Sequence, residues 1–199
     1  MLTKNRFFIG MVSIYIICMQ AFILLSNKGD ETVYLCLNRS GTLTDIFKLI
    51  TRFGEFIGLI GIGLYLAVKN RKALLAAALS FISFDIILLT LKRSLDYPRP
   101  LAYFQHGEIT PILEYKKLLH YSMPSGHTYT AFFCASFLIS FFSLNRKWQV
   151  LLFSAAILVG VSRMYLMCHF KEDVFVGSVL GIFAGVLPLF IYQKYFNKE

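Results

Sequence analysis

Charged residues are scarce in this sequence, and hydrophobic residues are unusually frequent. Only 16% of the 199 residues are Asp, Glu, Lys or Arg, whereas 57% are hydrophobic. The mean hydropathy is +0.63. This composition excludes an ordinary soluble domain, because such a domain needs more polar residues to cover its surface. The sequence therefore predicts an all-α polytopic membrane protein that lies in the lipid bilayer.

Cysteine is also scarce, and its placement is irregular. Cys18 and Cys134 lie inside apolar runs, and together with Cys36 and Cys168 they show neither CxxC nor metal-ligand spacing. We interpret them as small packing residues, so neither a disulfide framework nor a metal site is predicted. The formal net charge of +9 suits anionic lipid headgroups, but basic residues at helix ends would give the same value. No nucleic acid partner and no obligate protein partner is inferred.

Six apolar segments approach the length of about 20 residues that a membrane-spanning helix needs. The segments are 7–25, 50–68, 73–91, 124–144, 148–163 and 174–192. The first is long for the core of a signal peptide, and no small-residue cleavage pattern follows it, so we predict that it is a retained span. We expect a single membrane-embedded domain over residues 1–199, built as a six-helix bundle, with its motif-bearing core at 73–192.

The connections between these spans differ in polarity. Residues 27–44 are polar and are predicted to form an extramembrane loop. A helix is then expected to begin near Thr44, capped by its hydroxyl, and to continue into the second span. The short basic connections 69–72 and 145–147 lie on the side of the N-terminus. Because positive charge in short loops favours the cytoplasmic side, both termini are predicted to be cytoplasmic.

Two carboxylates lie within or near the predicted spans. Asp85 is the only charged residue of the third span, and a carboxylate there costs several kcal/mol unless it faces a partner or water. Lys92, two helical turns further along, is its expected partner, although the pair could equally be a purely structural tie. Glu55 precedes the uncharged part of the second span. Both carboxylates are candidates for supporting roles behind a functional site.

Three polar clusters lie at span ends that share one side of a six-span layout. Residues 92–100 leave the third span, residues 124–127 enter the fourth, and residues 162–173 connect the fifth to the sixth. A connection from an odd to an even span always lies opposite a cytoplasmic N-terminus. The three clusters are therefore predicted to meet at one surface, opposite both termini.

The residue types in these clusters suit a phosphate. Pro124 and Ser125 begin a helix whose free backbone N–H groups would point at a tetrahedral anion. Three cations would surround that anion: Lys92, Arg99 and Arg163. Taken singly, the basic residues could be interface residues that extend toward the headgroups, and the Pro-Ser-Gly sequence could be an ordinary helix start. Those interpretations do not explain why all of these features share one face.

Two histidines in the same clusters could act as a nucleophile and as a proton donor. His169 and Asp173 are four residues apart, so one helical turn would bring them together. A carboxylate there would hold one ring nitrogen as N–H and leave the other lone pair free to attack. His127 would be a second imidazole facing the anion. Two histidines on one phosphoryl group favour an in-line displacement, in which one attacks and the other protonates the leaving oxygen.

These residues resemble a known family. Lys92-x6-Arg99-Pro100, Pro124-Ser125-Gly126-His127 and Ser162-Arg163-x5-His169-x3-Asp173 are similar to the three signature motifs of the type 2 phosphatidic acid phosphatase and vanadium haloperoxidase superfamily, complete and in order. The resemblance implies a phosphatase that needs neither metal nor other cofactor and acts on a lipid phosphate or diphosphate. It also implies a site at the outer face of a bacterial inner membrane, toward the periplasm or exterior.

The resemblance further implies roles for individual residues. His169 would be the nucleophile that forms a phosphohistidine, and Asp173 would orient it. His127 would protonate the leaving group and then activate water. The phosphate oxygens would be held by Lys92, Arg99, Ser125, Gly126 and Arg163.

The substrate and two further interpretations stay open at this stage. Undecaprenyl diphosphate, the phosphate of lipid A and phosphatidylglycerol phosphate all suit a small outward-facing enzyme, and the sequence does not rank them. The lipid tail is expected to reach the site sideways between spans, along Gly54 and Gly58 or the segment around Glu55. A six-span carrier for an anion or a proton, or a non-catalytic phospholipid-binding protein, would use similar residues.

Overall fold

The computed structural model describes residues 5–104 and 119–196, and within these ranges it is helical and contains no strand. The prediction of an all-α protein is confirmed. The elements are α1 (Arg6–Leu25), α2 (Asp30–Leu37), α3 (Gly41–Thr51), the 3₁₀ helix η2 (Arg52–Gly54), α4 (Phe56–Lys69), α5 (Arg71–Leu95), α6 (Pro100–Tyr103), α7 (Gly126–Phe141), α8 (Arg146–Tyr165) and α9 (Lys171–Tyr195).

Several helical stretches are long and apolar enough to cross a membrane. The described residues contain five of them: Arg6–Leu25, Gly41–Lys69, Arg71–Tyr103, Arg146–Tyr165 and Lys171–Tyr195. The segment predicted as the fourth span is α7, whose 16 residues make it about 24 Å long at 1.5 Å per residue. Most of its side chains are buried. The membrane-spanning character is therefore supported, whereas the number of six spans stays a prediction.

Helices α7 and α9 pack backbone against backbone. A Cβ atom added to Gly177 would lie 2.5 Å from the carbonyl oxygen of Ser125, and one added to Gly181 would lie 2.5 Å from that of Tyr129. Gly185 repeats the arrangement against α7 one turn further on. These three glycines, four residues apart, let the two helices approach closely, because no larger residue fits these distances. This contact fixes the start of α7 beside the start of α9.

The prediction of a loop over residues 27–44 is wrong in part, because helix α2 forms within that range. Buried Lys171, at the start of α9, anchors this region: its Nζ donates to the carbonyl oxygen of Asn27 at 2.6 Å and forms an ion pair with Glu31 at 3.3 Å. The predicted cap also differs. Helix α3 begins at Gly41, and the hydroxyl of Ser40 accepts from the backbone N–H of Leu43 at 3.3 Å.

The second predicted span, 50–68, is interrupted. Helix α3 ends at Thr51, η2 makes one tight turn, and α4 begins only after Glu55. The turn brings Gly54 against α7 and α8, where an added Cβ would lie 2.8 Å from the carbonyl oxygen of His127. Sequence periodicity cannot show this break, because the close contact is made with residues far along the chain.

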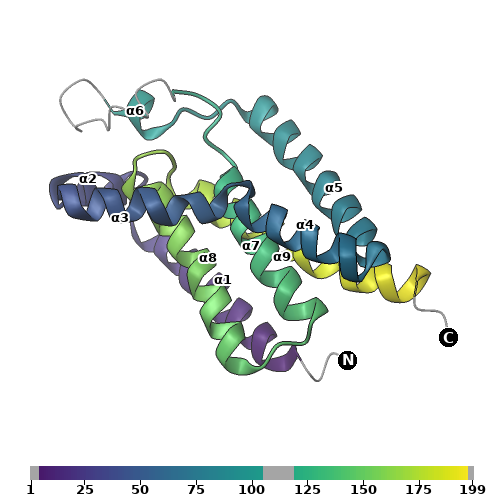
Figure 1. The fold of residues 1–199 in the computed structure, drawn as a ribbon. Helices are drawn as coiled ribbons and strands as arrows, with labels where there is room; N and C mark the ends of the chain where they lie inside the picture. Colours follow the sequence, from purple (N-terminus) through teal and green to yellow (C-terminus); the bar gives the residue numbers. More distant parts are fainter. Residues whose placement is uncertain (1–4, 105–118, 197–199) are drawn as a thin grey trace.

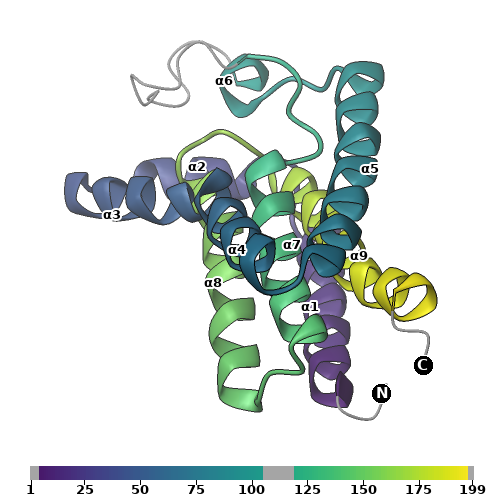
Figure 2. The same ribbon diagram turned by 45° about the vertical axis from the view of Figure 1, so that its right-hand side comes forward.

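All three predicted clusters lie at the same end of the molecule. Figures 1 and 2 show the C-terminal end of α5, the start of α7 and the connection from α8 to α9 together at one end, and the labelled chain ends toward the other. The arrangement agrees with the convergence that the six-span layout predicts. Which side of a membrane this end faces stays a prediction.

Candidate active site

His169 and Asp173 lie together in the connection from α8 to α9 and the first turn of α9. His169 Nδ1 is 3.4 Å from Asp173 Oδ2, and the two residues are only 2% and 3% exposed. A carboxylate can only accept, so this contact favours the tautomer with the proton on Nδ1 and the lone pair on Nε2. The structure therefore brings together the pair that the spacing predicted.

The carboxylate of Asp173 is held by further hydrogen bonds besides its contact with His169. Its Oδ2 accepts from the backbone N–H of Phe170 at 2.9 Å, which caps the start of α9, and from the hydroxyl of Ser122. Its backbone carbonyl accepts from the N–H of Ser125 at 3.0 Å. The carboxylate therefore links the start of α9 to the segment before α7. Ser122 is fully buried and was missed by the sequence interpretation, because a single serine before Pro124 carries no distinctive signal.

The surroundings of His169 keep its ring neutral. Burial lowers the pKa of His169 well below its ordinary value, and the positive charges of Arg99 and Arg163 lower it further. An imidazole in this environment carries no proton on its second nitrogen at neutral pH. The ring can therefore offer a lone pair rather than another positive charge.

Arg99 and Lys92 are tied to the same loop segments. Arg99 donates from its guanidinium to the carbonyl oxygen of His120 at 2.9 Å and to that of Cys168 at 3.2 Å. Lys92 Nζ donates to the carbonyl oxygen of Tyr121 at 2.9 Å. The second bond of Arg99 places this cation next to the residue that precedes His169. The first motif and the third are thus joined directly.

Arg163 lies near the end of α8 and is 3% exposed. One of its terminal nitrogens donates to Thr51 Oγ1 at 2.8 Å, so the end of α3 holds the guanidinium in place. Thr51 is the second supporting residue that the sequence did not reveal. Because a buried guanidinium is planar and always charged, it presents a fixed fork for an anion.

The start of α7 offers backbone donors. Ser125 is the residue before the helix, and Gly126 is its first residue. A Cβ added to Gly126 would meet open space, so the backbone here can be approached closely. The hydroxyl of Ser125 accepts from Thr128 Oγ1 at 2.9 Å and leaves the first N–H groups of the helix uncapped. Free amides at a helix N-terminus favour a bound anion.

His127 faces Glu55 across the break between α3 and α4. His127 Nε2 lies 3.8 Å from Glu55 Oε1, and the side chains are 32% and 49% exposed. His127 is therefore more accessible than buried His169. The contact gives Glu55 a specific place beside the predicted site.

Asp85 does not form the predicted pair with Lys92. Within the part of the chain that the structure describes, Lys92 binds a backbone carbonyl, and Asp85 makes no ion pair. The physical reason is that the segment before α7 is held beside the end of α5, where the N–H of Ser122 donates to the carbonyl oxygen of Tyr97 at 2.9 Å, so the carbonyl of Tyr121 accepts from the ammonium group. The expected pairing is thus wrong.

Metal-ligating residues show no cluster in residues 5–104 and 119–196. No group of three or more His, Cys, Asp and Glu side chains there is arranged to hold a metal ion. The prediction that the chemistry needs no metal stays a prediction.

Ser122 offers a test of how Asp173 is held. Ser122→Ala should lower kcat for a phosphate ester roughly tenfold or more, because a hydrogen bond to a charged group is worth about 1.5–3 kcal/mol. KM should stay within about twofold. Ser154→Ala on the exposed side of α8 is the control. A normal kcat for Ser122→Ala would show that Asp173 does not need this bond.

The chain was compared with known proteins. It is 37% identical over 77 residues to the lipid A 1-phosphatase of Porphyromonas gingivalis, a match that covers 38% of this chain and 17% of that protein. It is 29% identical over 188 residues to phosphatidylglycerophosphatase B of Bacillus subtilis, covering 86% of this chain and 85% of that protein. The chain spans 17% and 64% of the lengths of two curated relatives that it matches.

A solved structure has the same fold. The crystal structure of Aquifex aeolicus LpxE matches with a TM-score of 0.68 and 26% sequence identity, over 79% of this chain and 92% of that chain. The family model described as the PAP2 superfamily matches residues 73–198. This range contains all three motif clusters and the residues that surround His169. The chain belongs to the PAP2 superfamily.

Proposed function

We propose that this protein is a membrane-bound lipid phosphate phosphatase. The observation that carries the proposal is the environment of His169: a buried imidazole in contact with Asp173, with the charges of two arginines and an open helix N-terminus nearby. This combination suits nucleophilic attack on a group that is itself negatively charged. The names of the relatives support an activity on the phosphate of a membrane lipid.

The first step transfers the phosphoryl group to His169. The negative oxygens would repel a nucleophile, so Arg99, Arg163, the hydroxyl of Ser125 and the amide of Gly126 neutralise them first. Lys92 adds a third cation at the edge of the site. The Nε2 lone pair of His169 then attacks phosphorus in line with the leaving oxygen, while Nδ1–H stays bonded to Asp173. The P–O bond to the lipid breaks as the P–N bond forms.

His127 serves both halves of the reaction. In the first half it gives a proton to the leaving oxygen of the lipid, and in the second it takes a proton from the water that attacks the phosphohistidine. The second attack breaks the P–N bond and releases phosphate and free His169. Its greater exposure suits this role, because the water and the leaving group must both reach it. Glu55 Oε1 lies 3.8 Å from His127 Nε2, which is close enough for electrostatic attraction but too far for a direct hydrogen bond.

The proposal includes the placement of the enzyme in the membrane. A six-span bundle with cytoplasmic termini would put the clustered end of the molecule at the outer face of a bacterial inner membrane. Undecaprenyl diphosphate, lipid A phosphate and phosphatidylglycerol phosphate all present their phosphates at such a surface. The site geometry does not select among them.

Phosphate release by the purified protein is the direct test. The protein should liberate inorganic phosphate from at least one of these lipids in the presence of EDTA. Vanadate should inhibit the release, because it imitates the transition state at phosphorus. Retained binding of the lipids without any release would instead indicate a non-catalytic phospholipid-binding protein. A requirement for added metal would contradict the metal-independent mechanism.

A further inference from the structure

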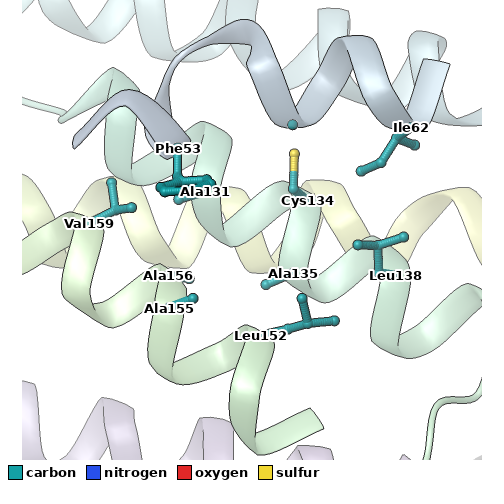
Figure 3. A pocket seen from close by; sticks show the side chains of 11 residues that line it. Phe53, Ile62, Ala131, Cys134, Ala135, Leu138, Leu152, Ala155, Ala156 and Val159 are labelled. Carbon is teal, nitrogen blue, oxygen red and sulfur yellow. The ribbon is translucent and has the colours of Figure 1, made fainter. Parts of the chain in front are cut away.

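An apolar cavity opens on the side of the molecule, between α4, α7 and α8. It encloses about 200 Å³, and its lining is apolar apart from the thiol of Cys134. Figure 3 shows α8 residues Leu152 and Ala155 on one side and Ile62 of α4 on the other, with the sulfur of Cys134 directed toward α4. Several of its walls are formed by small residues, which is why the helices leave a space.

The cavity is accessible from the lipid-facing surface. Ala155 is exposed, and Phe53, the residue before Gly54, is 63% exposed. On α4, Gly58 contributes no side chain, and a Cβ added there would lie 3.3 Å from Cys134 Sγ. An apolar space offers water no hydrogen-bond partners, so an apolar group is its favourable occupant. In a membrane, that occupant is a hydrocarbon chain.

The cavity also reaches the candidate active site. Val159 lines it, and a Cβ added to Gly54 would lie 2.6 Å from Val159 Cγ1 and 2.8 Å from the carbonyl oxygen of His127. Gly54 therefore packs between Val159, which lines the cavity, and the backbone of His127. From Ala131 to Leu138 the lining follows α7 for about 10 Å, at 1.5 Å per residue.

We propose that this cavity binds the part of the substrate's hydrocarbon tail nearest its phosphate. The inference rests on the proposed phosphatase function. A lipid whose phosphate lies between His169 and His127 must direct its tail into the bilayer, and only Gly54 lies between this cavity's residue Val159 and the backbone of His127. A second apolar cavity lies between α4 and α5 and includes Ala78 and Phe81, but it shares no residue with the contacts around Gly54. The first cavity is therefore the site that selects the tail.

Filling the cavity tests the proposal. Ala155→Phe should lower kcat/KM for dipalmitoyl phosphatidic acid at least tenfold, because even one methylene in an apolar pocket changes specificity by about 10–200-fold. For dibutyryl phosphatidic acid, which has the same headgroup and almost no tail, kcat/KM should change by less than about twofold. A uniform loss on both lipids, or no loss on either, would overturn the proposal.

Two matched variants identify where the tail binds. Ser154→Phe adds the same ring to the exposed side of α8, outside the cavity, and should leave the ratio of the two rates unchanged. Ala78→Phe fills the cavity between α4 and α5 and should also leave the ratio unchanged. If Ala78→Phe lowers the long-tail rate and Ala155→Phe does not, the tail lies between α4 and α5 and the proposal is wrong.

Enlarging the cavity gives an independent test if Ala155→Phe does not fold. Leu152→Ala should raise kcat/KM for a branched-tail lipid phosphate relative to dipalmitoyl phosphatidic acid, and an unchanged ratio would count against the proposal. Failure of the proposed function gives a separate result. The unmodified protein would then release no phosphate from either phosphatidic acid, nor from undecaprenyl diphosphate, lipid A phosphate or phosphatidylglycerol phosphate, which would reject both conclusions.

Discussion

His169→Ala should reduce phosphate release at least roughly 1,000-fold, since the variant lacks the atom that attacks phosphorus. Binding of vanadate should partly survive, because the arginines and the amides at the start of α7 remain. Initial rates and vanadate affinity of the two purified proteins would measure both effects. A folded variant that binds the anion but does not turn over is the expected result.

His120→Ala is the matched control for this change. His120 lies near the site, but its exposed side chain pairs with Asp96, and Arg99 binds its backbone carbonyl rather than its ring. Its removal should change the rate by only a few fold. Substantial hydrolysis by His169→Ala, with a normal circular dichroism spectrum, would show that the nucleophile is a different residue.

Arg163→Lys should lower kcat roughly 100-fold or more, although the charge is conserved. An ammonium group is a single point of charge and cannot reproduce the two parallel donors of a guanidinium. The loss is comparable with removal of one donor from an oxyanion hole. The lysine would also lose the geometry of the bond that Arg163 donates to Thr51 Oγ1. Steady-state kinetics of the purified variant would measure the change.

Arg93→Lys, at the exposed end of α5, provides the comparison for Arg163→Lys. It should leave kcat within about twofold, because an exposed basic side chain does not need a fixed fork. Thermal unfolding of both variants would show whether the buried substitution has disturbed the fold. A near-normal rate for a stable Arg163→Lys would mean that Arg163 does not hold the phosphate.

The motif residues could be predicted because their signals are local. His169 and Asp173 are separated by one helical turn, and Ser125 and Gly126 begin a helix directly after a proline. Hydropathy alone likewise predicted the ends of α1, α5, α8 and α9 to within a few residues. Such patterns depend on neighbouring residues, so they can be recognised without knowledge of the packing.

Other features depend on contacts between distant residues. Lys92 was expected to pair with Asp85 on its own helix, but a carbonyl 29 residues away binds it instead. The hydroxyl of Ser122 acts on a carboxylate 51 residues later in the chain, and Thr51 on a guanidinium 112 residues later. No periodicity or short motif marks these partners.

The sequence by itself determined that this is a helical membrane protein of the PAP2 type and which histidines, arginines and acidic residue form its motifs. Hydrophobicity indicates the membrane helices and short spacing indicates the polar clusters, whereas the family follows from the resemblance of those clusters to its three motifs. Only the tertiary structure decided where the second span breaks, which hydroxyls hold Asp173 and Arg163, and where a lipid-facing cavity meets His127. These features depend on contacts between segments that are far apart in the chain, and Gly54 and Gly177 are two places where such segments approach closely.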